Sequence, residues 1–450
     1  MTRSLALLAA CLVAACSRRA EPPSAPRADA AGTSTVLATF AEEAPPSSAA
    51  PAGLGLHPTA SGATPEFVFS ELGGGVAWAV EKDGRFRVVH NGHESRPYEA
   101  VGNIALSLDG RRCAFGALRD GKWRMVADEK EGAPWSAIQE PVFSPDGAHL
   151  AYLAMRGERW HLVVDGKANG GTPGRYAKPT FSGDSKRIAF VEEAAGDGSR
   201  KLTVADLGFE RTFTIDGSVS SFVVNTAGSR IAAIVRGSES WRVVSLSFDA
   251  PTEAVVGEGY DAAYAVSFGA DGSSVTFRGV RGSKGFVVLQ GREEPFAGDG
   301  VVTQAVGPGG RAVGVLVASG AEVRFHEHFA GVKDEGPFDE AEGLVYSGDG
   351  RLHAYAARRG GGWTVVVDGK QGPVFDRVVT PQFSPDGTRV VYRARKDGKR
   401  FVVVADTDAK TIRQHPPYEQ VFPVVFPADG KSVAYGVKDG PQLAWKVEPL

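Results

Sequence analysis

Histidine side chains offer the first candidates for chemistry in this sequence. His326 and His328 lie two residues apart, so on a β-strand both imidazoles would face one side, a spacing that can hold a metal ion. No third ligand is apparent beside them. His90 and His93 flank an Asn-Gly turn and could face each other in the same way. We expect exposed strand or turn positions at both places, with no metal and no other cofactor.

Residue patterns for catalysis are also missing. A nucleophile elbow needs Gly-x-Ser-x-Gly, and that pentapeptide does not occur. Several Asp-Gly pairs could suggest calcium loops, but a strand-like stretch follows each pair at once instead of further oxygen ligands. We therefore interpret the aspartates as turn residues and predict no catalytic residue.

Cations gather at short Gly-containing turns and give the one hint of a binding surface. In the architecture inferred below these turns share a face, which could attract an anionic partner. Carboxylates predicted on the same face, such as Glu99, Asp261 and Asp339, would weaken this effect by pairing with the cations. The candidate cations are Arg119, Arg156, Arg281, Lys284, Arg358, Arg359, Lys396 and Lys399.

An aromatic residue follows proline at several comparable positions, among them Trp135 and Tyr418. Such rings could form stacking platforms for a sugar or a peptide, and we include both in the candidate ligand face. The alternative is that they pack between neighbouring structural units.

These residues are carried by a repeat of about forty residues. Its clearest copy is residues 143–152, FSPDGAHLAY, in which an apolar anchor precedes a tight turn and a second strand. Ten anchors recur at spacings of 37 to 44 residues: Phe69, Leu106, Phe143, Phe181, Val224, Phe268, Val306, Tyr346, Phe383 and Phe426.

The residues after each anchor predict four strands per repeat. Glycine stands four residues after nine anchors and Ser185 after the tenth, as expected where a turn needs positive φ. Alternating apolar residues follow, such as Val390 and Tyr392, then further turns such as Lys396-Asp397-Gly398 and Val367-Asp368-Gly369. Each repeat is thus a four-stranded meander, which predicts an all-β propeller of about ten blades.

The turns Phe143-Ser144-Pro145-Asp146-Gly147 and Phe383-Ser384-Pro385-Asp386-Gly387 resemble the WD-type repeats of TolB-like β-propellers. The likeness covers about residues 65–450. It implies the fold but no activity, because the same blade serves many functions. The additional α/β or hydrolase domains of such relatives have no room in this chain.

Closure of the ring requires one more strand than the last repeat supplies. The last repeat offers three strands before Leu450, and residues 33–40, TSTVLATF, are the one early segment that could supply a fourth. We predict a single ring closed by this strand. Eight or nine blades, or two rings of five, are the alternatives.

The first residues read as an export signal. Arg3 precedes the apolar stretch 5–15, which is too short to span a bilayer, and Val13-Ala14-Ala15-Cys16 resembles a bacterial lipobox. This resemblance implies lipidation of Cys16, with Ser17 after it typical of outer-membrane lipoproteins. We predict a signal peptide at 1–16, an Ala/Pro/Ser-rich tether at 17–64 and the propeller at 65–450.

The net charge and the cysteine content give two further indications about partners and chemistry. The net charge of -3 gives no argument for nucleic acid as a partner. Cys113 is the one cysteine left after the first sixteen residues, at an inward strand position, and we expect a buried, inert thiol there.

We therefore predict a lipid-anchored, non-catalytic binding or assembly module of the bacterial cell envelope, with an envelope protein or polysaccharide as partner and a membrane contact through the lipid only. The alternatives are an envelope enzyme, such as a glycan lyase or hydrolase or a peptidase relative that uses the central funnel, and a purely structural protein. Function is expected where the chain departs from its repeat, at the charged turns, at the irregular repeats of residues 224–306 and at His353, which stands where other repeats have an apolar residue.

Overall fold

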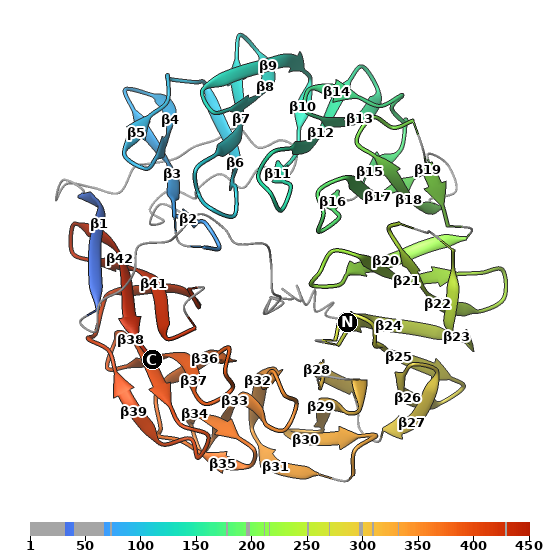
Figure 1. The fold of residues 1–450 in the computed structure, drawn as a ribbon, viewed down its shortest axis with the longest axis vertical. Coiled ribbons are helices and arrows are strands. Elements are labelled where there is room, and N and C mark those ends of the chain that lie inside the picture. Colours follow the sequence, from blue (N-terminus) through green and yellow to red (C-terminus); the bar gives the residue numbers. More distant parts are fainter. Residues whose placement is uncertain are drawn as a thin grey trace, which may run out of the picture.

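The chain forms a ring of ten four-stranded blades. The structure, a computed structural model, describes residues 32–39 and 67–450, apart from 73, 177–178, 195–198, 211, 216, 250–251, 270, 297–299, 308–309, 332 and 428–429. Its named elements are all β-strands, and their ten sheets follow one another around a central opening (Figure 1). The predicted all-β propeller is confirmed, with ten blades. Within the described residues, the chain has no helix with the length and apolar character needed to cross a membrane.

In the first five blades the strands run from the axis outward in chain order. Blade 1 contains β2 (Val68–Phe69), β3 (Val76–Lys82), β4 (Arg85–His90) and β5 (His93–Glu94), and blade 2 contains β6 (Ala100–Leu106), β7 (Cys113–Arg119), β8 (Lys122–Ala127) and β9 (Lys130–Trp135). Blade 3 contains β10 (Ala137–Ile138), β11 (Val142–Phe143), β12 (Leu150–Arg156), β13 (Arg159–Val164) and β14 (Lys167–Ala168). Blade 4 contains β15 (Arg175–Tyr176), β16 (Thr180–Phe181), β17 (Arg187–Glu193), β18 (Arg200–Asp206) and β19 (Thr212–Thr214). Blade 5 contains β20 (Ser218–Val224), β21 (Arg230–Arg236), β22 (Trp241–Ser247) and β23 (Ala254–Tyr260).

The other five blades repeat this order. Blade 6 contains β24 (Ala262–Phe268), β25 (Val275–Arg281), β26 (Lys284–Leu289) and β27 (Arg292–Phe296), and blade 7 contains β28 (Gly300–Val306), β29 (Val313–Ser319), β30 (Glu322–His328) and β31 (Asp334–Phe338). Blade 8 contains β32 (Glu340–Tyr346), β33 (His353–Arg359), β34 (Gly362–Val367) and β35 (Lys370–Gln371), and blade 9 contains β36 (Arg377–Phe383), β37 (Val390–Lys396), β38 (Lys399–Ala405) and β39 (Thr411–Gln414). Blade 10 contains β40 (Gln420–Val425), β41 (Ser432–Asp439), β42 (Gln442–Pro449) and, as its outer strand, β1 (Thr33–Thr39).

The repeated turn explains the regular spacing of the blades. Nine of the ten anchors are the last residue of an innermost strand, and the tenth, Phe426, follows β40 directly. The fourth residue after the anchor has positive φ at every described turn, including Ser185 at 61°. Glycine takes this conformation without the cost that a Cβ brings, so it recurs there. The Ser185 Oγ accepts a hydrogen bond from the Asp146 amide of the preceding blade, at 3.1 Å.

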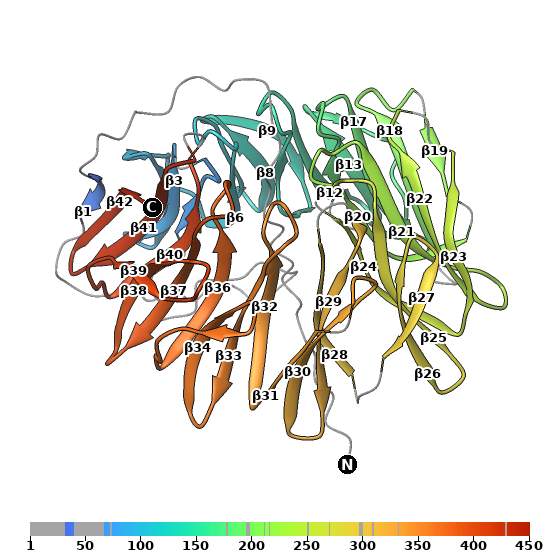
Figure 2. The same cartoon turned by 60° about the horizontal axis from the view of Figure 1, so that its bottom comes forward.

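The core lies between the blades, which stand side by side around the ring (Figure 2). Each second strand buries its alternate residues against the neighbouring blade, and Val390 and Tyr392 in β37 have no exposed surface. In blades 3 and 4 the innermost strand is broken into two short pieces. Pro141 and Pro179 stand just before the second pieces, whereas Pro381 lies at the same place inside the continuous β36, where the register shifts between Val379 and Gln382.

The N-terminal strand closes the ring. β1 pairs antiparallel with β42, and Ser34 faces Lys446 in the register, with its Oγ accepting a hydrogen bond from the lysine Nζ at 2.7 Å. The predicted closing strand at 33–40 is thus confirmed as the outer strand of blade 10, over 33–39. The predicted signal peptide with Cys16, and the rest of the tether, lie outside the described residues.

Candidate functional site

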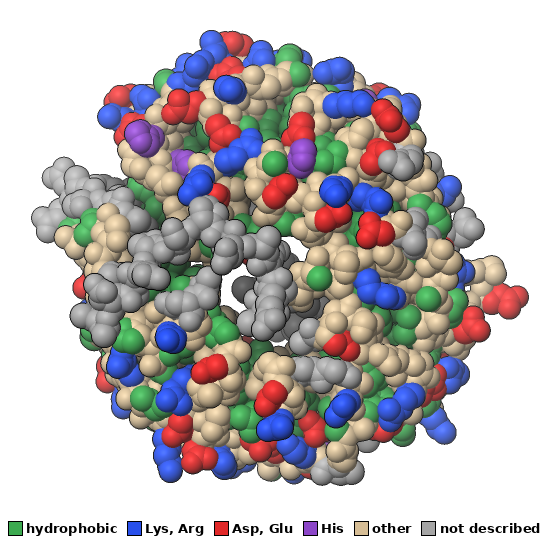
Figure 3. All heavy atoms as spheres, viewed as in Figure 1, with side chains coloured by type: hydrophobic (Ala, Val, Ile, Leu, Met, Phe, Trp, Pro, Cys, Tyr) green, Lys and Arg blue, Asp and Glu red, His purple; other side chains and the backbone are tan. Residues whose placement is uncertain are grey.

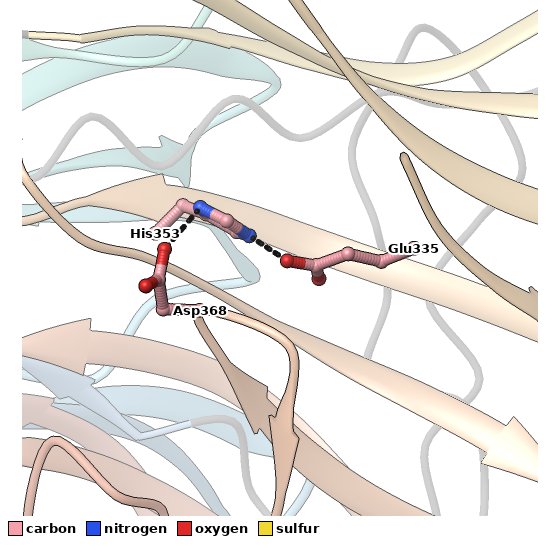
Figure 4. Close-up of side chains that lie close together, drawn as sticks. All are labelled: Glu335, His353 and Asp368. Atoms are coloured by element: carbon pink, nitrogen blue, oxygen red, sulfur yellow. Dashed lines mark hydrogen bonds and ion pairs between the residues drawn. The ribbon is translucent and has the colours of Figure 1, made fainter. Parts of the chain in front are cut away.

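His353 is the clearest departure from the repeat, and it lies between blades 7 and 8. It begins β33 at the position where the other second strands carry an apolar residue, and its side chain has no exposed surface. Nε2 lies 3.0 Å from Oε1 of Glu335, which β31 of blade 7 supplies. Nδ1 lies 3.5 Å from Oδ1 of Asp368, at the β34–β35 turn, and has no hydrogen-bond partner (Figure 4). Two carboxylates from neighbouring blades therefore flank one buried imidazole.

Local chain geometry sets this arrangement. Asp368 and Gly369 have φ of 45° and 79°, as in a two-residue hairpin turn, and the Asp368 amide donates to the carbonyl oxygen of His353 at 3.0 Å. Glu335 is paired with Phe325 across strands β30 and β31. The Phe325 ring stacks on the imidazole, with centroids 4.0 Å apart and planes 13° apart.

Polar groups surround the two carboxylates. The Tyr355 hydroxyl donates to Oε2 of Glu335 at 2.8 Å, and Lys333 Nζ donates to Oδ1 of Asp368 at 2.8 Å. The hydrogen bond to Asp368 raises the pKa of Lys333, while burial and then the Glu335 charge raise the pKa of Tyr355. Lys333 therefore stays charged and Tyr355 neutral at ordinary pH.

Other blades use the third-turn residue differently. Asp128 and Asp165 each accept a hydrogen bond from the backbone amide that begins the second strand, at 3.2 and 2.9 Å. In blade 8 the equivalent Asp368 instead contacts Lys333 and the His353 ring. The site thus combines His353 and the turn residue Asp368 of blade 8 with Lys333 and Glu335, which precede or belong to the outer strand of blade 7.

The remaining histidines do not converge with two further ligands. Glu335, His353 and Asp368 form the one group of three metal-binding side chains among the described residues. His90 and His93 pair across their turn as expected. The expectation of exposure is wrong for His328, which is 9% exposed because it packs toward blade 6, with Nδ1 3.1 Å from Glu294.

Three of the eight cations in the predicted ligand face form ion pairs with carboxylates. Arg119 lies 3.2 Å from Glu131, Arg281 lies 2.7 Å from Glu293, and Arg358 lies 2.6 Å from Glu340. Between-blade carboxylates also accept hydrogen bonds from hairpin amides: Glu99 from Asp120, Asp261 from Gly282, Asp339 from Gly360 and Asp376 from Asp397. The rim is thus paired in part, and its between-blade carboxylates accept hydrogen bonds from backbone amides of the hairpins.

The two aromatic candidates are buried. Trp135 is 3% exposed and Tyr418 is 8% exposed, so neither ring is open as a stacking platform. The Arg156 guanidinium lies 4.2 Å from the Trp135 ring centroid, and Arg359 covers Phe338 in the same way at 4.8 Å. These rings pack at blade boundaries under arginine side chains, and that cation–π contact is the local role of Arg156 and Arg359.

Three predicted cations stay exposed without an ion pair among the described residues: Lys284, Lys396 and Lys399. Lys284 belongs to blade 6 and the other two to blade 9, so they do not form one patch. On the face shown in Figure 3, cationic and anionic side chains are interspersed around the opening.

The sequence identified His353 as an exception and Asp368 as a turn residue, but it did not bring them together with Glu335. In blades 1, 2, 3, 6 and 8 the amide of the first third-turn residue donates to the carbonyl oxygen of the first residue of the second strand. The proximity of Asp368 to His353 could therefore have been inferred from the repeat. The contact of Glu335 in blade 7 with His353 in blade 8 has no corresponding pattern in the local sequence.

Comparisons with known proteins assign no family to this chain. No protein-family model matches the sequence, and no curated protein matches it. Among solved structures, a eukaryotic initiation factor is 12% identical over 76% of this chain and 96% of that chain, with a TM-score of 0.47. TolB from Acinetobacter baumannii is 16% identical over 63% and 79%, with a TM-score of 0.29, and a prolyl endopeptidase is 14% identical over 69% and 55%, with a TM-score of 0.36. The propeller assignment rests on the strand pairing of the chain itself.

Proposed function

We propose that this protein is a lipid-anchored, non-catalytic binding or assembly module of the bacterial cell envelope, with a protein or a glycan as partner. One observation carries the proposal: the N-terminal strand β1 closes the outer edge of blade 10, so the ring is tied to the chain segment that follows the lipobox-like sequence. Sixteen residues lie between Cys16 and Thr33. An anchor at Cys16 would hold the rim of the ring near a membrane surface.

The surfaces of the ring that are open to a partner are its two faces, which are made of turns and loops. Buried residues of the blades contact one another, and the two faces consist of turns and between-blade loops, where binding residues are most often placed on a rigid scaffold. Kinship with TolB-like propellers is part of the proposal and is supported by the FSPDG turns at 143–147 and 383–387.

The alternative of an enzyme in the central funnel needs acidic, basic or histidine side chains on the innermost strands. Apart from Arg175, the innermost strands carry three charged residues, and these are paired at 2.6 Å: Glu340 with Arg358, and Glu342 with Arg377. This pairing supports a binding role over catalysis at the axis. Turnover of an envelope polysaccharide by the purified protein, lost on changing axial residues, would reverse that preference.

The anchor is tested by labelling and fractionation in a bacterial host. Wild type should incorporate labelled fatty acid and fractionate with membranes, because more than one acyl chain gives stable anchoring. Cys16→Ala should lose the label, while the matched variant Cys11→Ala should keep it. Label that persists in Cys16→Ala, or soluble wild type, would contradict the anchoring proposal.

A further inference from the structure

Burying the His353 imidazole in an apolar blade interface carries a desolvation cost. A polar group that loses water costs free energy unless a partner satisfies it. Five other blades have valine at this position (Val76, Val275, Val313, Val390 and Val433), and all are buried. Packing alone would therefore not select histidine here.

The two ring nitrogens have different environments. A carboxylate only accepts, so Nε2 must carry a proton and donate it to Glu335, at an ordinary hydrogen-bond distance of 3.0 Å. In the neutral ring Nδ1 then has a lone pair, and this lone pair faces Oδ1 of Asp368 across 3.5 Å with no hydrogen-bond partner. Two acceptors that face each other are stable only with a positive charge between or beside them.

The spacing of these two acceptors suits a metal ion. Ligand atoms about 2.0 to 2.2 Å from a tetrahedral ion lie roughly 3.4 Å from each other. Glu335 has the place of the outer carboxylate that accepts from the second nitrogen of a metal-bound histidine, fixing its tautomer and raising its basicity. The Asp368 carboxylate is itself held by the Lys333 ammonium at 2.8 Å, so this oxygen already has a cation beside it.

We propose that Nδ1 of His353 and Oδ1 of Asp368 bind one divalent transition-metal ion of the zinc class, with Glu335 as the positioning carboxylate. An imidazole ligand favours this class over calcium or magnesium, which prefer oxygen. The ion takes the place of the Lys333 ammonium beside Asp368. The Lys333 side chain is 42% exposed and can turn to solvent, and Asp368 is 31% exposed, so water reaches the remaining coordination positions. The bound ion would join blades 7 and 8.

The test is a titration of the chelator-treated full-length protein with Zn²⁺, followed by calorimetry and by the unfolding temperature. We expect one ion per chain and a higher unfolding temperature with zinc, since a ligand that binds the native state stabilises it. His353→Val should weaken binding at least tenfold without loss of folding, because valine is the residue of five other blades. Asp368→Asn should weaken it similarly, and Glu335→Gln by about 10- to 100-fold.

Two more variants distinguish a metal site from a network of ion pairs. Lys333→Met removes the competing ammonium and should tighten zinc binding. His149→Ala removes a histidine that contacts Asp165 at the equivalent turn of blade 3, with Nδ1 2.6 Å from the carboxylate, and should leave zinc binding unchanged. Wild type that binds no zinc while folded, or binding that survives His353→Val, would overturn the proposal.

Discussion

His353 and Cys113 occupy the same position in their blades, the first residue of the second strand. Both are buried, at 0% and 5% exposure. Cys113 behaves as the small apolar residue that the repeat calls for, packed with Ala77, Val88 and Phe115. His353 brings polar partners from two blades with it. The same repeat position is thus an apolar packing residue in blade 2 and part of a polar site in blade 8.

The Cys113 thiol should be inert in the folded protein. Burial, with a smaller effect of the Asp128 charge, raises its pKa to about 12, so almost no thiolate exists near neutral pH. A thiol reagent at pH 8 should react with Cys113 only after unfolding in denaturant. Modification of the native protein at the rate of the unfolded chain would show that the blade 2 interface is open.

At the scale of elements, the closing strand β1 pairs with β42 through its backbone. Ser34, Thr35 and Val36 are all exposed, and Val36 retains 53% of its surface. The register with β42 therefore decides whether the ring is closed as described.

A disulfide tests this register. Ser34 and Lys446 are cross-strand partners with side chains in contact, so Ser34→Cys with Lys446→Cys should oxidise readily and raise the unfolding temperature. Thr35→Cys with Lys446→Cys is the matched control, because neighbouring residues of a strand face opposite sides. Equal oxidation of both pairs, or of neither, would contradict the closure.

Much of the element structure could be predicted from the sequence, because each blade repeats local chemistry. An apolar anchor, a glycine at positive φ and alternating apolar residues define strands and turns within a few residues of one another. His353 was visible as an exception to this pattern. Its partner Glu335 was not, since the pairing depends on how blade 7 packs against blade 8. The burial of Trp135 under Arg156 is likewise a contact between blades that no local spacing indicates.

At the scale of the whole molecule, ten blades make a ring, and on one of its faces cationic and anionic side chains are interspersed. The ion pairs of Arg119, Arg281 and Arg358 lie on three different blades, so no single cationic patch dominates the hairpin face. Exposed pairs of this kind contribute only about 0 to 1 kcal/mol each. Recognition of a partner would then depend on the shape and loops of one face rather than on net charge.

The most direct test of a binding role is photo-crosslinking in intact cells. A photoreactive residue would replace Lys284 or Lys396 on the hairpin face, and Gln290 or Glu129 at third turns on the opposite face. The account predicts a discrete covalent adduct with an envelope protein or glycan from the positions of one face, and none from the other. Absence of adducts from both faces, in protein that is folded and correctly localised, would contradict the claim that this propeller is a binding module.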